Sequence, residues 1–342
     1  MNTFTFVGKI KKPEKKEDII KVGNNGKKYL RLNIRQNENN SATVYLYGEK
    51  LINGCIPVVI NKKREMVKYE DRFNENILSK ISFVSKFQTI VDGYIKNFIW
   101  KDDFMDFIYE TLCKMPENTL YELRGEFNVS YSNNKSYNNF MLKSFRVNNN
   151  ARPDLKLYLD LFYNSQSLDE SDKRNKFIIN SYIEQYSYSE RQMEYFPLQT
   201  QFITNRFNFK SPADIEIIQH RKANLSPKKE EGYVKAKWEA QYVKGAQLIL
   251  PPLETLPKDI QFEIKNAGRD LKEYMSNVVG TAAEYICLTR PDNTKSKDGE
   301  VYESLGISNE EFEKRINNNY KQDESRSIDK IAKKEAIENP FN

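Results

Sequence analysis

Histidine and cysteine are scarce in this chain of 342 residues, which has one histidine, His220, and three cysteines. The cysteines are widely separated, so the sequence offers no C-x-x-C pair and no zinc ligand set. With a single histidine, acid-base and nucleophilic centres lack their commonest proton carrier. The glycine patterns that cradle phosphates, G-x-x-x-x-G-K-[ST] and G-x-G-x-x-G, do not occur. We therefore expect a protein that is not an enzyme and that uses no metal and no cofactor.

Long apolar runs are also missing from the sequence. No stretch approaches the roughly 18 apolar residues of a membrane-spanning helix, and the first residues form no apolar signal region. The cysteine usage shows no disulfide framework. These features predict a cytoplasmic protein with no membrane partner.

Charge and aromatic residues are both abundant. The chain is 30% charged and 13% aromatic, with 21 tyrosines and 20 phenylalanines, and its formal net charge is +6. Residues 1–150 contain 25 Lys and Arg against 17 Asp and Glu, whereas residues 151–300 contain 22 of each and residues 301–342 contain 7 against 9. The basic field therefore belongs to the N-terminal half, where we expect contact with a polyanion.

The hydrophobic pattern of the N-terminal half predicts three strands, one helix and two strands. We expect strands at 3–10, 28–35, 42–48, 121–131 and 138–147, a helix at 102–114, and a basic insertion at 49–101 with short β-like runs at 77–84 and 87–98. This order is that of the OB-fold, a five-stranded Greek-key barrel that binds oligonucleotides across its second and third strands. Residues 1–150 are therefore expected to form an OB-like domain that binds single-stranded DNA.

A similar order follows a predicted linker at 148–153. Strands are expected at 155–162, 177–188, 194–204, 233–242 and 282–289, with one helix starting near Ser211 and another near 258–277. Residues 151–306 are therefore expected to form a second OB-like or α+β domain, and 307–342 a short helix at 308–317 with a flexible tail. The predicted fold class is mainly β, with two OB-like barrels in tandem and helical insertions.

Alternation along two strands of the first domain predicts a binding face. Leu30, Leu32, Ile34, Val44 and Leu46 fall on one face, which we expect to be buried. The opposite face carries Lys28, Tyr29, Arg31, Asn33, Arg35, Tyr45 and Tyr47. Aromatic rings beside cations are what a single strand needs, because each base offers a π-face and each phosphate a negative charge. Exposed tyrosines also occur simply because they favour strands, so the ensemble of residues carries more weight than any single ring.

Further rings and cations extend the predicted interface. The additional candidates are Tyr137, Phe140, Lys143 and Arg146 near the last strands of the first domain, and Lys235 and Lys237 in the second half. Phe127 and Trp238 are expected in cores. Asp102, Asp103 and Asp106 resemble a magnesium ligand set, but acidic residues in the first turn of a helix are better explained by the helix dipole.

The sequence resembles the OB-fold single-stranded DNA-binding proteins of the divergent kind found in bacteriophage replication modules. The resemblance rests on the opening residues 4–10, the strand pair 29–35 and 43–47, and the ending Asn339, Pro340 and Phe341. It implies that Pro340 and Phe341 dock replication or recombination proteins, since bacterial members end in an acidic tip closing with Pro-Phe. Here Asn342 follows the phenylalanine and Lys333 and Lys334 lie close by, so the tail departs from that pattern.

These observations predict a non-catalytic, sequence-tolerant protein that coats and protects single-stranded DNA in phage replication or recombination, in the cytoplasm of the host. Two alternatives stay open. A virion assembly protein would use its exposed tyrosines as a protein interface, where such rings are enriched. A replication or recombination accessory factor would bind DNA only together with a partner.

Overall fold

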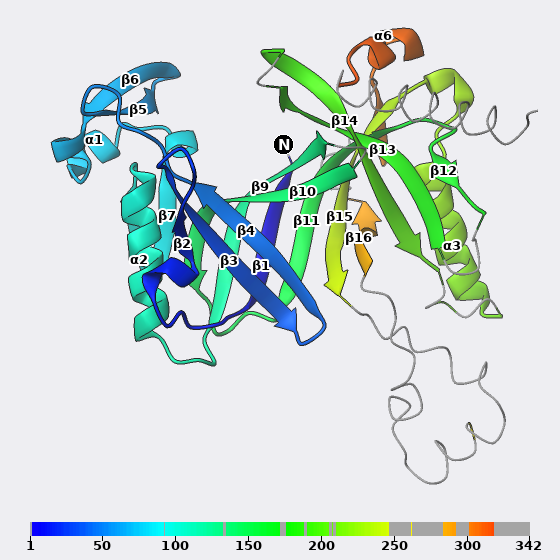
Figure 1. The fold of residues 1–342 in the computed structure, drawn as a ribbon. Coiled ribbons are helices and arrows are strands. Elements are labelled where there is room, and N and C mark those ends of the chain that lie inside the picture. The colour runs from blue at the N-terminus through cyan, green and yellow to red at the C-terminus, as the bar shows by residue number, and fades with distance from the viewer. Residues whose placement is uncertain are drawn as a thin grey trace, which may run out of the picture. The chain divides into compact units, whose positions relative to one another are not determined.

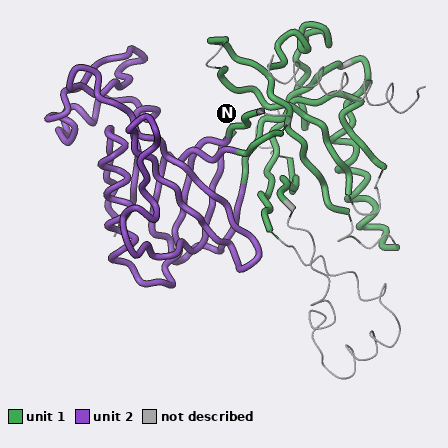
Figure 2. The backbone as a smooth tube through the Cα atoms, viewed as in Figure 1, with its two compact units in different colours: residues 1–2, 128–138, 157–342 green, residues 3–127, 139–156 purple. Residues whose placement is uncertain are grey.

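The computed structural model describes residues 2–91, 93–132, 135–171, 176–187, 190–204, 207, 210–245, 261, 283–291 and 301–317. The chain divides into two compact units, shown in Figure 2: unit 2 contains residues 3–127 and 139–156, and unit 1 contains residues 1–2, 128–138 and 157–342. Each unit is mainly β, as predicted (Figure 1). The expected domain boundaries near residues 150 and 306 stay predictions.

Unit 2 is built around a ring of five strands, β1 (Thr3–Ile10), β3 (Lys28–Asn37), β4 (Asn40–Tyr47), β9 (Leu120–Ser132) and β10 (Lys135–Val147). Antiparallel pairs join β1 to β3, β3 to β4, and β9 to β1, while β4 and β10 pair in parallel. A pairing of β9 with β10 closes the ring. This connectivity is that of the OB-fold, which confirms the predicted barrel.

The interior of this first barrel is filled by the residues that alternation assigned to it. Leu30, Leu32, Ile34, Val44 and Leu46 are each no more than 2% exposed. The rings of Phe4, Phe6 and Phe127 pack with Phe140 at centroid distances of 4.8 to 5.5 Å. Phe127 is therefore a core residue, as predicted.

Two glycines let backbones approach closely in this barrel. A methyl group on Gly8 would overlap the carbonyl oxygen of Arg35, across the β1–β3 pair. A methyl group on Gly125 would overlap the carbonyl oxygen of Met141 and come within 2.8 Å of the Phe4 ring. Both positions therefore require a residue without a Cβ.

The loop between β1 and β3 carries a 3-10 helix, η1 (Lys16–Asp18), and a short strand, β2 (Ile20–Val22), which pairs with β3. The amide of Arg31 donates to the carbonyl of Ile19 at 2.8 Å, which ties this loop to the strand beside it. Five lysines occur between residues 11 and 21 of the loop. Basic side chains are thus fixed close to β3.

The insertion forms more structure than the sequence predicted. It contains the hairpin β5 (Cys55–Ile60) and β6 (Lys63–Lys68), two short 3-10 helices, η2 (Tyr69–Asp71) and η3 (Phe83–Ser85), and the short helix α1 (Glu75–Leu78). The predicted β-like run at 77–84 is wrong as a strand, because these residues lie in α1, a turn, a single β-bridge from Ile81 to Ile60, and η3. Ile56, Val58 and Trp100 belong to a small core that supports the hairpin.

The predicted run at 87–98 is a hairpin, β7 (Phe87–Val91) and β8 (Tyr94–Phe98), and β7 extends the barrel sheet by pairing in parallel with β10. Helix α2 (Lys101–Lys114) follows, as predicted, and buries Phe104 against the rings of Phe87 and Phe98. Its first turn is acidic and its last turn holds Lys114, which suits the helix dipole.

Unit 1 contains a second ring with the same connectivity. Its strands are β11 (Asp154–Tyr163), β13 (Lys176–Ser187), β14 (Gln192–Ile203), β15 (Val234–Gly245) and β16 (Ala283–Pro291). Antiparallel pairs join β11 to β13, β13 to β14, and β15 to β16. Strand β14 pairs in parallel with β16, and a pairing of β15 with β11 closes the ring. The predicted second barrel is therefore present, with Trp238 in its core at 1% exposed.

Smaller elements complete unit 1. Helix α3 (Pro212–Leu225) begins at Ser211, whose hydroxyl accepts from the Asp214 amide, and the 3-10 helix η4 (Lys229–Glu231) follows it. Strand β12 (Leu168–Asp169) pairs with β13, and β17 (Tyr302–Ser304) pairs with β15. Helix α6 (Asn309–Lys314) starts at Ser308, as its capping pattern predicts. Apart from Gln261, the helix predicted near 258–277 lies outside the described residues, as does the tail with Pro340 and Phe341.

Candidate nucleic-acid interface

The candidate interface is the outward face of β3 and β4. Cross-strand register places Tyr29 opposite Tyr47, Arg31 opposite Tyr45, Asn33 opposite Thr43 and Arg35 opposite Ser41. All of these side chains are exposed or half-buried, whereas the residues between them are buried. We refer to Tyr29, Arg31, Asn33, Arg35, Tyr45 and Tyr47 as the platform.

The three tyrosine rings of the platform form one cluster. The rings of Tyr45 and Tyr47 lie 6.0 Å apart and within 6° of parallel, and the ring of Tyr29 lies 6.1 Å from that of Tyr47. Tyr47 is 50% exposed, so it presents ring surface to solvent. Partial burial, and then the neighbouring phenols of Tyr45 and Tyr29, raise the pKa of Tyr47 above its ordinary value. Tyr47 is therefore uncharged at neutral pH.

The two arginines of the platform are free to bind an anion. Arg31 and Arg35 are exposed, and neither has an ion-pair partner within the part of the chain that the structure describes. They alternate with Asn33 along β3, so the three polar side chains share one line beside the rings. Rings and guanidinium groups on one surface allow base stacking and phosphate contact together.

The basic loop between β1 and β3 flanks this line. A hollow beside it is lined by Lys11, Lys12, Lys21, Arg31 and Asn33 together with Glu14 and Asp18. A second hollow of about 860 Å³ is lined by Lys9, Lys11, Lys12 and Arg35 together with Glu14, Glu38 and Glu117. Another, at the tyrosine end, is lined by Lys27, Lys28, Tyr29 and Tyr47. In OB-folds the loop after the first strand borders the oligonucleotide face. The sequence analysis placed the positive charge in residues 1–150 but did not include Lys11, Lys12 or Lys21 in the site.

Phe140 was predicted in the interface, and this is wrong. It is 1% exposed and lies inside the first barrel between Phe4, Phe6 and Phe127. The physical reason is the alternation of β10, which turns Phe140 and Leu142 inward and leaves Met141 outside, beside Tyr45. A ring in this position has no accessible face for a base.

Several predicted cations are held by carboxylates. Lys28 Nζ lies 3.4 Å from Asp102 Oδ2 at the start of α2, and Lys143 Nζ lies 3.6 Å from Glu126 Oε1. Lys143 also lies over the Phe87 ring, at 5.2 Å from its centroid. Burial raises the pKa of Asp102, and the charge of Lys28 opposes this effect. These two lysines therefore have structural partners, unlike Arg31 and Arg35.

Arg146 belongs to a buried carboxylate network. Glu122, only 4% exposed, accepts from Arg124 Nε and Arg146 Nη2 at 2.5 Å and from Asn148 Nδ2 at 2.7 Å. Burial alone would raise the pKa of Glu122, but the hydrogen bonds from Arg146 and Asn148 and the two guanidinium charges lower it below its ordinary value. Arg146 thus compensates a buried charge, a role that sequence spacing did not reveal.

The remaining candidates belong to unit 1. Tyr137 is 47% exposed and lies near the tip of the β9–β10 hairpin, which belongs to unit 1. Lys235 Nζ pairs with Asp160 Oδ2 at 3.1 Å, and Lys237 is half-buried on the outward side of β15. The platform of unit 2 therefore includes none of these three residues.

The aspartates of α2 are each paired with a cation. Asp103 Oδ2 accepts from Arg72 Nε at 2.7 Å, and Asp106 Oδ1 lies 2.8 Å from Lys16 Nζ. Across the described ranges, no group of three or more His, Cys, Asp or Glu is placed to hold a metal ion. His220 is exposed on α3. No helix in the described part of the chain is long and apolar enough to cross a membrane.

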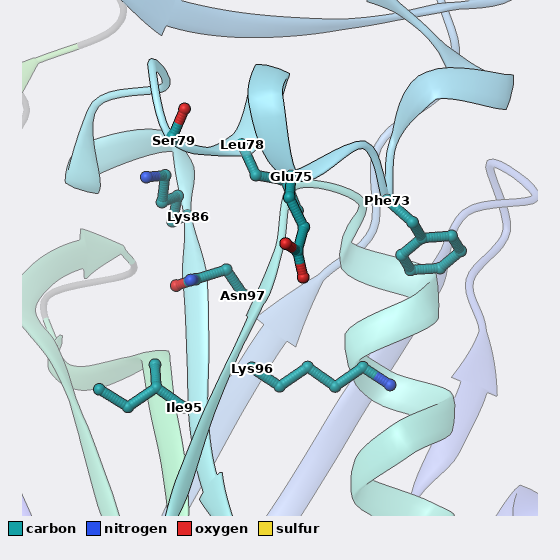
Figure 3. A pocket seen from close by; sticks show the side chains of 8 residues that line it. All are labelled: Phe73, Glu75, Leu78, Ser79, Lys86, Ile95, Lys96 and Asn97. Atoms are coloured by element: carbon teal, nitrogen blue, oxygen red, sulfur yellow. The ribbon is translucent and has the colours of Figure 1, made fainter.

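A separate hollow of about 650 Å³ lies in the insertion (Figure 3). Glu75 and Leu78 reach into it from α1, and Lys96 and Asn97 from β8. Apolar side chains nearby are unusually exposed, with Tyr94 at 80% and Ile95 at 64%. This surface is distinct from the platform.

Comparison with known proteins finds a likeness among solved structures but no family match. No family model and no curated protein matches this chain. Among solved structures, the wild-type single-stranded DNA-binding protein from Thermus aquaticus aligns over 71% of this chain and 85% of its own, at 8% identity and a TM-score of 0.30. A deletion mutant of that protein aligns over 75% and 97%, at 11% identity and the same TM-score. A likeness at this level assigns neither family nor function, so the interface must be judged from its own residues.

Proposed function

We propose that the protein binds single-stranded DNA without strong sequence preference, through the platform of the first barrel. The observation that carries this proposal is the joint position of three tyrosine rings and two arginines on the outward face of β3 and β4, where neither arginine has an ion-pair partner among the described residues. Bases stack on rings of any sequence because every base has a π-face. The arginines and the adjacent lysine-rich loop neutralise phosphates.

The proposed role is non-catalytic coating and protection of single strands in replication or recombination. In line with the sequence resemblance, the setting is a phage genome in the cytoplasm of its host. Pro340 and Phe341 are proposed to dock replication or recombination partners. An accessory factor would differ in binding DNA weakly by itself and gaining affinity only with such a partner.

The test is fluorescence anisotropy with labelled dT and mixed-sequence oligonucleotides, single-stranded and duplex, at two salt concentrations. We expect tight binding to both single strands, a weak response to duplex, and an affinity that falls as salt rises. Absence of binding at low salt would overturn the proposal. Weak binding that a partner restores, and that is lost on deletion of residues 337–342, would instead favour the accessory factor.

A protein-assembly function is the second candidate, because the insertion exposes an apolar surface. Phe83 and Val84 in η3 are 63% and 60% exposed, close in sequence to the exposed Tyr94 and Ile95 of β8. Exposed apolar patches mark protein interfaces. This function predicts salt-insensitive self-association in sedimentation velocity and no protection of oligonucleotides from nuclease.

A further inference from the structure

The second barrel has an aromatic surface in the place that corresponds to the platform. In both barrels the second and third strands of the ring form an antiparallel hairpin, β3–β4 in the first and β13–β14 in the second. On β13, Ser181 and Ile183 are buried in the barrel, so Tyr182 faces outward. Tyr195 of β14 lies opposite Glu184, on the same outward side. The outward face of this hairpin therefore also presents tyrosines.

Two more rings extend this surface onto neighbouring strands. Phe162 of β11 pairs directly with Tyr182, and Tyr233 precedes β15 with its ring 6.0 Å from that of Tyr182. We refer to Phe162, Tyr182, Tyr195 and Tyr233 as the cradle. Lys235 Nζ lies 5.5 Å from the centroid of Phe162, so a cation stands beside the rings here too.

The cradle is occupied by Phe312 of α6. The Phe312 ring lies 3.9 Å from that of Tyr195 at an interplanar angle of 14°, and 3.8 Å from that of Tyr233 at 9°. Two rings cannot both lie this close to one face of a third ring, so Tyr195 and Tyr233 cover opposite faces of Phe312. Tyr182 meets its edge at 5.5 Å and 73°. A flat ring held between two parallel rings is the arrangement that a stacked nucleobase would adopt.

The segment that carries Phe312 is fastened mainly at its ends. At one end β17 pairs with β15. At the other, the amide of Tyr195 donates to Arg315 O at 2.9 Å and the amide of Asn317 donates to Tyr195 O at 3.0 Å. Arg315 Nη2 also pairs with Glu184 Oε1 at 2.9 Å, with both side chains partly exposed. Within the segment, Phe312, Ile316 and Asn317 are buried, and Asn317 Nδ2 donates to the buried Glu194 Oε2 at 2.6 Å. These contacts do not join two strands of the ring to each other, so the segment can detach without opening the barrel. Figure 1 shows α6 beside the upper ends of β13 and β14.

We propose that the cradle is a second base-binding site, which Phe312 fills in the free protein and a base of single-stranded nucleic acid takes when residues 305–317 move away. This inference rests on the proposed function of the platform, because it assigns the same ligand class to the second barrel. Lys235 lies beside Phe162 but pairs with Asp160 in the free protein, so it would have to leave that carboxylate to meet the backbone phosphate of the base. Glu184 and Glu194 hold Arg315 and Asn317 and so favour the closed arrangement.

The first test is Phe312→Ala, which empties the cradle and keeps its four rings. Affinity for a long dT oligonucleotide should rise, because a base no longer has to displace the Phe312 ring. The gain should reach at most the stacking contribution of one base, roughly 5- to 150-fold. Adding Tyr195→Leu and Tyr233→Leu should abolish the gain. Glu310→Gln is the matched control, because Glu310 is exposed in the first turn of the same helix.

A second variant and a second measurement test the inference independently of whether Phe312→Ala folds. Arg315→Ala with Asn317→Ala loosens the segment but keeps the Phe312 ring, and it should raise affinity in the same direction. In the unmodified protein, a saturating long oligonucleotide should increase deuterium uptake in residues 305–317. An unchanged affinity in folded Phe312→Ala, together with unchanged uptake, would overturn the inference while platform binding stands. If the unmodified protein binds no single strand at all, the proposed function itself fails.

Discussion

Replacing Tyr45 by alanine is the sharpest test of the platform. Tyr45 lies between Arg31, its cross-strand partner, and Tyr47, whose ring is 6.0 Å away and nearly parallel. Its side chain is outside the barrel core, so removing it leaves no internal cavity. The substitution therefore changes the binding surface with little effect on folding.

The expected loss follows from the stacking contribution of one ring. Base–aromatic stacking contributes about 1 to 3 kcal/mol, which corresponds to an affinity roughly 5- to 150-fold weaker for Tyr45→Ala. Tyr47→Ala should weaken binding by a similar factor. Because the two rings contact each other, the double variant should lose less than the product of the two factors. Tyr45→Phe should bind like the unmodified protein, because stacking needs the ring and not the hydroxyl.

The assay is anisotropy with labelled dT at fixed salt, with the melting temperature of each variant measured in parallel. Tyr158→Ala is a matched control, since Tyr158 is an exposed tyrosine of β11 at 38%. If Tyr45→Ala binds as tightly as the unmodified protein, the rings do not stack on bases. If Tyr158→Ala weakens binding as much as Tyr45→Ala, the effect does not depend on the platform. Either result refutes the reasoning.

Three other predictions concern charge, pH and packing. The double variant Arg31→Ala, Arg35→Ala should reduce the magnitude of the slope of log affinity against log salt by about 1.4, since each phosphate contact contributes about 0.7. The control Lys63→Ala, Arg64→Ala on β6 removes the same charge and should leave the slope nearly unchanged. Glu122→Gln should cost about 1.5 to 3 kcal/mol at pH 7 by urea unfolding, because hydrogen bonds to charged groups are lost. Folding lowers the pKa of Glu122, so the stability that its charge contributes is complete above the ordinary glutamate pKa and is lost as pH falls through the folded pKa. The free energies of unfolding of Glu122→Gln and the unmodified protein should therefore converge in acid. A difference that persists at pH 2 would contradict this. Gly125→Ala should cost about 1 to 3 kcal/mol by overpacking against Met141 and Phe4, whereas Gly23→Ala, whose methyl would meet nothing closer than 3.3 Å, should cost little.

The strands and the platform were predictable because both depend on a local period. Alternation in residues 28–35 and 42–48 assigned each side chain to a face, and the structure places the leucines inside and the tyrosines and arginines outside. The same rule applied to β10 would have placed Phe140 inside with Leu142. Its assignment to the interface came from grouping rings by sequence proximity instead of by face.

Other parts of the site depend on contacts between residues far apart in the chain. Glu122 and Arg146 are 24 residues apart, and Lys28 meets Asp102 only because α2 begins beside the end of β4. The hairpin β5–β6 was missed because β6 consists mostly of exposed, charged residues, so it shows no alternation. No sequence signal distinguishes a cation that is free from one that is already paired.

The two barrels share one connectivity, and this makes their difference informative. In the first barrel the outward face of β3 and β4 is open, and its rings lie beside arginines without partners in the described chain. In the second the equivalent face of β13 and β14 is closed by α6, and Tyr195 is only 2% exposed. Since the connectivity is the same, we attribute the proposed difference in affinity between the two faces to the segment that covers one of them, α6. Substitutions at Tyr45 and at Phe312 should therefore change binding in opposite directions.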